Sequence, residues 1–309
     1  MLKVKVDIKA ALVKRHDEKV SGSVYVRSFR YKTGSNGKQF VKGILCDQES
    51  IIGFVVWSET IEEFRVVDKE KILTISGRID TWNSNSTIVL ESVKSDAYGY
   101  THKDFLCGYD GHELEEEFYK FLSQVNPKVK QLVNKIVVGD VKERFFSEFA
   151  AKRKHDACVG GLANHTIKML RLAKTMIAND KRLVAYSDVI YVGIICHDLG
   201  KIRELYMGDY VKNSFTTHRE YGCEMMYKIK KDIINLFDEN FFYHILAIIR
   251  GHHHIYDEKA KTIYAYIIHL IDMMDAQVTE FMDTINTHNC KEKIDEEKII
   301  EHDGQIFHY

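Results

Sequence analysis

The spacing of apolar residues changes once along the chain, and this change limits the folds that it can adopt. Residues 19–95 contain β-rich apolar runs at 20–26, 40–46, 51–57, 72–79 and 87–93, and a Gly/Asn/Ser turn cluster at 33–37 separates the first two. From residue 113 onward the spacing is helical, as in Leu114, Phe118, Phe121 and Leu122. A chain of 309 residues holds about two domains at ~100–200 residues each. We therefore expect a β domain followed by an all-α domain.

The order of elements in the first part predicts a particular β architecture. The polar stretch 58–64, between the third and fourth strands, is long enough for one or two helical turns. Five strands with one short helix at that place predict a small Greek-key barrel of the OB type. A plain two-sheet β domain is the alternative.

The predicted domain boundaries follow from the same change of pattern. Residues 1–95 form the β domain, residues 96–112 carry mixed turn residues and form a linker, and residues 113–289 form consecutive helices. Pro127 after Asn126 is a typical helix start. Residues 290–309 are a polar C-terminal tail.

Composition excludes several classes of protein. Hydrophobic residues make up 45% and charged residues 29% of the chain, which is typical of a globular protein and not of a disordered one. Apolar runs such as 189–196 are far shorter than the ~18–20 residues that cross a bilayer, and the N-terminal segment lacks the apolar core of a signal peptide. The six cysteines form no CxxC pair. We therefore expect a cytoplasmic protein with reduced thiols and no membrane contact.

Charged residues and histidines are unevenly distributed. Residues 1–95 contain 16 Lys and Arg against 12 Asp and Glu, whereas 12 of the 15 histidines lie at or after His155. In the β domain, cations interleave with aromatic residues, a combination that binds single-stranded nucleic acid because bases stack on rings while cations contact phosphates. About half of these rings must form the barrel core. The substrate-binding residues predicted here are Arg27, Arg30, Lys38 and Trp57.

The segment His197-Asp198-Leu199-Gly200-Lys201 is the sharpest chemical feature of the helical part. It follows residues 189–196, which are apolar on every side and predict a buried helix. An imidazole and a carboxylate at the end of such a helix are costly unless a partner compensates them, and a bound cation does so. Gly200 is placed to end the helix, and Lys201 supplies a positive charge for a phosphate. A buried histidine hydrogen-bonded to its neighbourhood is the alternative.

Further histidines and aspartates lie within or after apolar segments that predict helices. His165 lies on the buried face of its helix, and Asp272 and Asp275 are three residues apart in an apolar helix, where an unpaired carboxylate would need a metal, an arginine or a capping role. His218 lies four residues before Gly222, and His252 and His253 follow an apolar helix. A satisfied core histidine and a solvated histidine loop are the simpler readings of each feature alone.

Taken together, His165, then His197-Asp198, then Asp272 are similar to the H…HD…D signature of the HD superfamily of metal-dependent phosphohydrolases. With the β-rich front, residues 155–166 and the segment 269–276, the chain resembles the YhaM-type 3′–5′ exoribonucleases from about residue 15 to about residue 285. It departs from that pattern at Asp156, at His254 and in residues 257–262, which concern loops facing the substrate and leave the metal scaffold intact.

The resemblance implies a fold, an activity and a set of site residues. It implies an all-α HD bundle behind the OB-like barrel, with one or two divalent ions, Mn²⁺ first and Fe, Mg, Ni or Zn as alternatives. His165, His197, Asp198 and Asp272 would bind one metal, and His218, His252 and His253 would complete a second site or hold the phosphate, with Asp198 bridging. Lys201 and Asp198 would act in catalysis. His155 and Asp275 would contact the substrate.

The implied reaction is hydrolysis of single-stranded RNA, or also DNA, from the 3′ end to nucleoside 5′-monophosphates. An HD-type hydrolase of a small nucleotide or cyclic dinucleotide is the alternative, and an inactive HD fold that only binds nucleic acid is a third reading. The first reading explains the OB-like module, because a nucleotide hydrolase needs no groove for a strand. A homo-oligomer is an expectation without an interface signal in the sequence.

Overall fold

The chain divides into a barrel unit, residues 1–107, and a helical unit, residues 108–309, in the computed structural model. The structure describes residues 4–48, 50–82, 85–96, 98–152, 156–211, 215–254, 258–291, 299–302 and 305–308. Residues 96–112, expected as a linker, contain a short 3₁₀ helix, η1 (His102–Asp104), and the boundary between the two units. Each unit has a hydrophobic core of its own.

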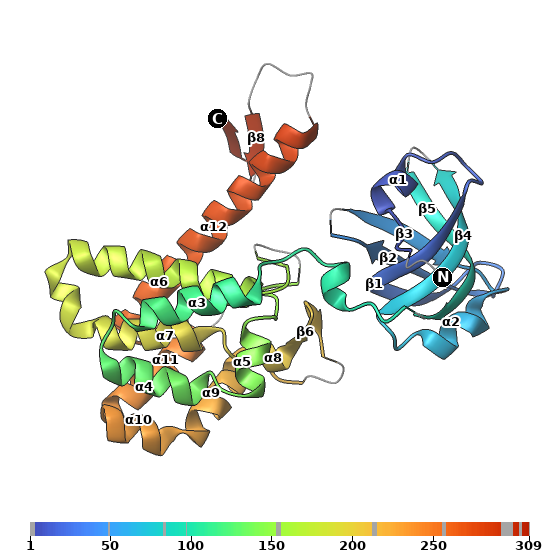
Figure 1. The fold of residues 1–309 in the computed structure, drawn as a ribbon. Coiled ribbons are helices and arrows are strands. Elements are labelled where there is room, and N and C mark those ends of the chain that lie inside the picture. Colours follow the sequence, from blue (N-terminus) through green and yellow to red (C-terminus); the bar gives the residue numbers. More distant parts are fainter. Residues whose placement is uncertain are drawn as a thin grey trace. The chain divides into compact units, whose positions relative to one another are not determined.

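Five strands close the barrel unit: β1 (Lys19–Thr33), β2 (Gln39–Cys46), β3 (Ile51–Val56), β4 (Ile72–Trp82) and β5 (Asn85–Ser95). They pair in the order β1-β2-β3-β5-β4, with β3 and β5 parallel and β4 returning to β1. Helix α2 (Ile61–Val67) lies between β3 and β4, and a short helix α1 (Ile8–Leu12), which the sequence analysis missed, precedes β1 (Figure 1). The predicted five-stranded barrel is therefore confirmed.

Alternation along the strands gives the barrel a core and an outer face. Val41, Phe54 and Leu73 are fully buried, and Phe64 of α2 packs against Phe54 with ring centroids 5.8 Å apart. Neighbouring positions on β1 and β2 point outward, where Arg30 pairs with Lys42 in the strand register. The inward side chains supply the stabilising burial, which leaves the outward ones free for binding.

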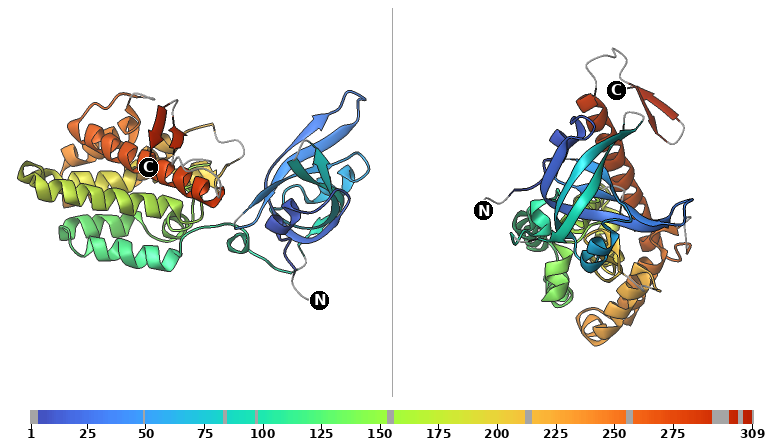
Figure 2. Two further views of the ribbon diagram at one scale, coloured as in Figure 1. Left: turned by 90° about the horizontal axis from the view of Figure 1, so that it is seen from above. Right: turned by 90° about the vertical axis from the view of Figure 1, so that its right-hand side faces the viewer.

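Helices form most of the second unit (Figure 1, Figure 2). They are α3 (Gly111–Leu122), α4 (Pro127–Ile136), α5 (Asp140–Phe145), α6 (Gly161–Asn179), η2 (Lys181–Tyr186), α7 (Ser187–His197), α8 (Lys201–Glu204), α9 (His218–Lys228), α10 (Lys230–Leu236), α11 (Glu239–Gly251) and α12 (Ile263–Lys291). Two small hairpins accompany them: β6 (Leu205–Tyr206) with β7 (Asp209–Tyr210), and β8 (Ile299–His302) with β9 (Gln305–His308). The β8–β9 hairpin lies within the segment that was predicted to be a polar tail.

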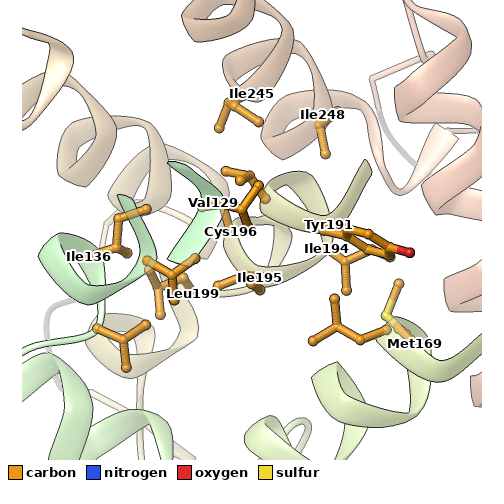
Figure 3. Packing of buried hydrophobic residues seen from close by; sticks show 14 of the residues in the cluster. Val129, Ile136, Met169, Tyr191, Ile194, Ile195, Cys196, Leu199, Ile245 and Ile248 are labelled. Carbon is orange, nitrogen blue, oxygen red and sulfur yellow. The ribbon is translucent and has the colours of Figure 1, made fainter. Parts of the chain in front are cut away.

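Helix α7 is the centre of the helical unit. Each of its residues from Val189 to His197 is buried, and it packs against α4, α6, α11 and α12. Figure 3 shows this packing, with α7 side chains among residues from the neighbouring helices, labelled Val129, Ile136, Met169, Ile245 and Ile248. The stretch Lys181–Glu204, which includes α7, is long and apolar enough to cross a membrane by length and composition, but 67% of its most apolar window is buried inside the unit. Core packing accounts for its apolar character.

Candidate metal centre

His165 is held between two aspartates of α12. It lies on the buried face of α6 with 1% of its surface exposed. Its Nδ1 atom is 2.7 Å from Asp275 Oδ2, and its Nε2 atom is 3.2 Å from Asp272 Oδ1. Asp272 and Asp275 reach it together because residues three apart lie on the same side of a helix. The structure thus brings together two segments that are more than 100 residues apart.

His197 and Asp198 end the buried helix α7. His197 Nδ1 donates to the Ile194 carbonyl at 2.6 Å, so its Nε2 atom keeps a free lone pair. That atom is 3.4 Å from Asp198 Oδ2. Both side chains are almost completely buried. The helix end therefore presents one nitrogen and one carboxylate to the interior, in the tautomer that binds metals.

Gly200 contributes through close packing and not as the predicted helix end. It has φ −64°, in the right-handed region, and α7 already ends at His197. A Cβ atom at Gly200 would lie 1.8 Å from the His218 carbonyl oxygen and 2.7 Å from the Gly222 nitrogen. Only glycine lets α9 approach the His197-Asp198 turn closely enough for His218 to reach Asp198.

His218 and His252 approach Asp198 from two further helices. His218 begins α9 behind a Thr217/Glu220 capping box, and its Nδ1 atom is 3.0 Å from Glu204 Oε2. His252 follows α11 and donates from Nδ1 to the Ile249 carbonyl at 2.9 Å. Their Nε2 atoms lie 3.4 and 3.5 Å from Asp198 Oδ1. As at His197, a partner at Nδ1 orients the ring and leaves Nε2 for another ligand.

Four buried polar atoms at this place have no hydrogen-bond partner: His197 Nε2, Asp198 Oδ1, His218 Nε2 and His252 Nε2. Leaving such atoms unpaired costs about 1–3 kcal/mol each, so bound groups that pair with them are expected here. Three nitrogen lone pairs beside one carboxylate require electron-pair acceptors. A divalent cation fits this donor set.

The donor atoms form two groups that are both compact enough for an ion. His165, His197 and Asp272 form one, and Asp198, His218, His252 and His253 form the other, with ligand atoms within 4.8 Å of one another in each group. Asp198 points one oxygen toward His218 and His252 and the other toward His197. All seven residues that the sequence analysis named as metal ligands therefore lie together.

Burial and neighbouring charges set the protonation states of these groups. Burial lowers the pKa of His252 and of His253, the latter to about 3, so both imidazoles are neutral at neutral pH. Burial raises the pKa of Asp198, but Lys201 and His197 outweigh it and hold that pKa well below its usual range. Burial also opposes protonation of His165, but hydrogen bonds to Asp272 and Asp275 raise its pKa to about 9. A cation bound by Nε2 would replace that proton.

Lys201 lies beside the same carboxylate. Its Nζ atom donates to Asp198 Oδ2 at 2.5 Å. Burial alone would lower the pKa of Lys201, but the Asp198 carboxylate raises it, so the side chain is an ammonium. This places a fixed positive charge at the edge of the centre, where the sequence analysis expected one for a phosphate.

Asp275 lies behind His165 and belongs to a network of charges. Lys168 Nζ contacts Asp275 Oδ2 at 3.1 Å and Asp156 Oδ2 at 2.8 Å, and Asn164 donates to Asp156 Oδ1 at 2.7 Å. Asp156, His165 and Asp275 also lie within ligand distance of one another, but the Lys168 ammonium already supplies their counter-charge. The sequence analysis expected Asp275 to contact the substrate. Its position behind His165 favours a role in orienting that imidazole instead. His155, which was also expected to contact the substrate, lies outside the described residues.

Glu204 and Lys168 are functional candidates that the sequence analysis did not single out. Glu204 orients His218, and Lys168 links the two aspartates behind His165. Lys168 follows His165 at i+3 on the same helix, a spacing that places the two side chains as neighbours and that a search for partners of His165 would use. Glu204 has no comparable signal in the sequence, because the β6–β7 hairpin separates it from His218 along the chain.

The remaining predicted residues lie in the barrel unit. Lys38 and Trp57 line one surface hollow together with Phe40, whose ring centroid is 5.3 Å from that of Trp57. The other lining residues belong to the adjoining loops, apart from Gln39 of β2. Arg30 is exposed on the outer face. Arg27 is half-buried at the bulge between Val26 and Ser28, outside this hollow. Three of the four residues are thus exposed as a ligand-binding role requires.

Comparison with known proteins agrees with this geometry. Residues 162–277 match the HD domain family. A protein of a Geobacillus species named 3′-5′ exoribonuclease YhaM is 28% identical over 193 residues, which cover 61% of this chain and 59% of that protein. A protein of Listeria welshimeri with the same name is 25% identical over 284 residues, 88% of this chain and 89% of that protein.

Solved structures resemble a part of this chain. A mitochondrial single-stranded DNA binding protein of S. cerevisiae matches 26% of this chain and 94% of its own with a TM-score of 0.22 at 12% identity. The second OB-fold domain of replication protein A from Methanococcus maripaludis matches 28% and 91% with a TM-score of 0.21 at 16% identity. The helical unit thus carries an HD domain, and relatives over most of the chain confirm the resemblance to the YhaM-type exoribonucleases that the motifs indicated.

Proposed function

We propose that this chain is a metal-dependent 3′–5′ exonuclease that hydrolyses the phosphodiester bonds of single-stranded RNA to nucleoside 5′-monophosphates. The observation that carries the proposal is the set of four unpaired buried atoms from α7, α9 and α11 around Asp198. Without a bound cation, these unpaired buried atoms would destabilise the folded protein. The names of the relatives support RNA as the substrate and the 3′ end as the starting point.

His165, His197, Asp272 and one oxygen of Asp198 would hold one ion, and His218, His252, His253 and the other oxygen would hold a second. A divalent cation supplies positive charge for the phosphodiester and lowers the pKa of a bound water. The protein fixes the ligands: the Ile194 and Ile249 carbonyls, Glu204 and Asp275 each engage an Nδ1 atom and aim the opposite nitrogen into the centre. Lys201 stabilises negative charge on the phosphoryl oxygens.

The mixture of imidazole and carboxylate ligands suits several first-row metals, and we propose Mn²⁺ as the working ion. The outer face of the barrel unit would bind the strand through Trp57, Lys38 and Arg30, with bases stacking on rings and cations contacting phosphates. RNA is proposed over DNA, and the cytoplasm is the proposed compartment. Self-association stays an expectation of the sequence.

Short RNA labelled at either end tests the reaction. With Mn²⁺, we expect 5′-labelled RNA to give a ladder that shortens from the 3′ end, and 3′-labelled RNA to release labelled mononucleotide at once. Excess chelator and the Asp198→Ala variant should both stop the reaction, whereas Asp232→Ala, a surface aspartate paired with Lys135, should not.

Separate incubation with mononucleotides and cyclic dinucleotides tests the alternative activity. Loss of small nucleotides without shortening of RNA would replace the proposal with a nucleotide phosphohydrolase. A mobility shift of RNA without cleavage under any divalent ion would indicate an inactive HD fold that only binds.

A further inference from the structure

Helix α12 carries apolar side chains on two sides, and only one of these sides packs inside the helical unit. It is the longest helix among the described residues, and its C-terminal part extends beyond the other helices of the unit (Figure 1). On the inner side, Ala265 and Ile268 are fully buried, and Asp272 and Asp275 reach His165. The core and the candidate metal centre therefore account for the inner side alone.

The outer side of α12 presents a continuous apolar stripe to solvent. Each of its side chains is between 41% and 62% exposed, although β8 contacts the same helix. Five of the six recur at every fourth residue, and such a series forms one ridge along a helix surface. This outer stripe consists of Ile263, Tyr266, Leu270, Met274, Val278 and Met282.

Charged residues are excluded from the outer stripe. Residues 263–282 contain three of them, Asp272, Asp275 and Glu280. The first two face the interior, and Glu280 is two positions from the stripe residues on either side of it, a spacing that places side chains on different sides of a helix. Gln277 is exposed but uncharged. Because the solvent side of a helix normally carries charges, the outer stripe has the composition of an interface.

The exposed area of the outer stripe is large enough for a small, specific interface. Six large side chains with about half of their surface exposed offer roughly 600 Å² per copy, the upper end of the ~300–600 Å² found for the largest patch on a typical monomer. Two such patches in contact would bury up to about 1,200 Å², which is the lower limit for specific, stable interfaces. The stripe extends for about 28 Å along the helix, so its occupant is another extended element.

We propose that the outer stripe is a homodimer interface, in which α12 packs antiparallel against α12 of a second copy of this chain. A ridge of residues four apart fits the grooves beside an identical ridge, and a two-fold axis brings the same patch of both copies together. With the axis between Leu270 and Met274, Leu270 faces Met274 of the second copy, and Tyr266 faces Val278. The inference is independent of the proposed function, because the metal centre lies on the other side of the helix.

Charges near the two ends of the helix favour the antiparallel orientation. Lys259 and Lys261 precede α12, and the side chain of Lys261 is 74% exposed, whereas Glu280 lies in the C-terminal part. An antiparallel pair brings the basic start of one helix toward the acidic part of the other, and a parallel pair would bring like charges together. A membrane surface is the less suitable occupant, because helices that lie on membranes are rich in Lys and Arg, and residues 263–282 contain neither.

Sedimentation velocity of the full-length protein over a wide range of concentrations tests the interface. The wild type should reach twice the mass of one chain. The double variant Leu270→Glu, Met274→Glu places four carboxylates at the two-fold axis and should raise the dissociation constant of the dimer at least about 30-fold, the size of effect at an interface hot spot. The control Val138→Glu, Val184→Glu changes two residues that are 58% and 55% exposed outside α12, and it should keep the wild-type constant.

Photo-cross-linking identifies the occupant without relying on the Glu variant. Benzoylphenylalanine in place of Leu270 keeps a large apolar side chain at that position. In an equal mixture of unlabelled and isotope-labelled chains, we expect a cross-link between a light and a heavy chain, at or next to Met274. A cross-link within one chain would assign the stripe to another segment of the same molecule.

Four results would overturn the homodimer interface: a wild type that stays monomeric at every concentration, an unchanged dissociation constant in the Leu270/Met274 variant, an equal loss in the control, or cross-links within single chains alone. Circular dichroism shows whether the Glu variants fold, and if they do not, the cross-link decides. Failure of the proposed function would be seen separately, as a dimer that does not hydrolyse RNA under any divalent ion.

Discussion

The barrel unit and the helical unit treat charged side chains in opposite ways. Among the described residues of the barrel unit, the polar side chains that are buried are Ser23 and Thr60, and neither is charged. In the helical unit, Glu148, His165 and Asp198 are among several ionisable side chains that are almost completely buried. The barrel keeps most of its cations in water, whereas the helical unit buries several of its acids and imidazoles.

This difference teaches which unit performs which task. Binding a strand through its phosphates needs cations that are exposed to water and that displace counterions from the strand. Exposed cations of this kind do not lower the stability of the fold. Holding a metal ion needs ligands without competing water, and burying them costs several kcal/mol per charge unless an ion compensates. Each prediction below therefore changes one unit and expects the other to keep its property.

Loss of one buried imidazole should separate the two tasks most clearly. We expect His197→Ala to lower the rate of RNA hydrolysis by more than about 100-fold, since even changes behind a metal ligand cost 10–100-fold. RNA affinity, measured by fluorescence anisotropy, should stay at the wild-type value because the barrel is untouched. His112→Ala, at an exposed histidine on α3, is the control and should keep both. Equal loss of affinity and activity in His197→Ala would break the comparison.

Removal of the carboxylate behind His165 should weaken the centre without removing a ligand. We expect Asp275→Ala to lower Mn²⁺ affinity by about 10–100-fold, measured by titration calorimetry, because the His165 ring loses the partner that orients it. Asp275→Asn still accepts a hydrogen bond from Nδ1 and should recover part of the loss. Asp188→Ala, at the start of α7, should leave the affinity unchanged. Unaltered Mn²⁺ affinity in both Asp275 variants would show that only the direct ligands determine the affinity for the metal.

Loss of the exposed ring in the barrel should have the reverse effect. Trp57→Ala is expected to weaken RNA binding by about 1–3 kcal/mol, the contribution of one stacked base. The turnover number at saturating RNA should not change, which kinetic assays over a range of RNA concentrations would show. Ile51→Ala removes an exposed side chain at the other end of β3 and serves as the control. A fall in turnover with unchanged KM would contradict this division of tasks.

The smallest effect is expected for single cations of the barrel. Arg30→Ala and Lys38→Ala should each make the slope of log affinity against log salt less negative by about 0.7, as for one phosphate contact to a single strand. Lys19→Ala, whose side chain is 85% exposed at the start of β1, is the matched control. Identical slopes for all three variants would show that the strand-binding surface does not include Arg30 and Lys38.

Local patterns predicted much of this molecule because its key segments carry their own signal. The run 189–196 is apolar on every side, so its burial and the cost of His197-Asp198 after it follow from sequence alone. The five strands and the helix between β3 and β4 were likewise expected from alternation and turn residues. The convergence of His165 and Asp272 depended on the resemblance to a family, since no local rule pairs residues more than 100 positions apart.

What the sequence did not predict depends on contacts between segments. The β6–β7 hairpin has strands of two residues, too short for alternation, and its turn carries Met207 in a left-handed conformation that favours Gly or Asn. The role of Gly200 was assigned to a helix end because the approach of α9 is visible only in three dimensions. The resemblance implied that Asp275 contacts the substrate, whereas its contact with Lys168 joins two helices and has no local signal in the sequence.

The carboxylate of Asp198 has a consequence for how the centre fills. Its two oxygens belong to different donor groups, so an ion at either position would fix the orientation that the other position needs. Occupancy of the two positions should therefore rise together, with a steep dependence on metal concentration. The enzyme would then respond to a narrow range of free metal and switch between an empty and a fully loaded form.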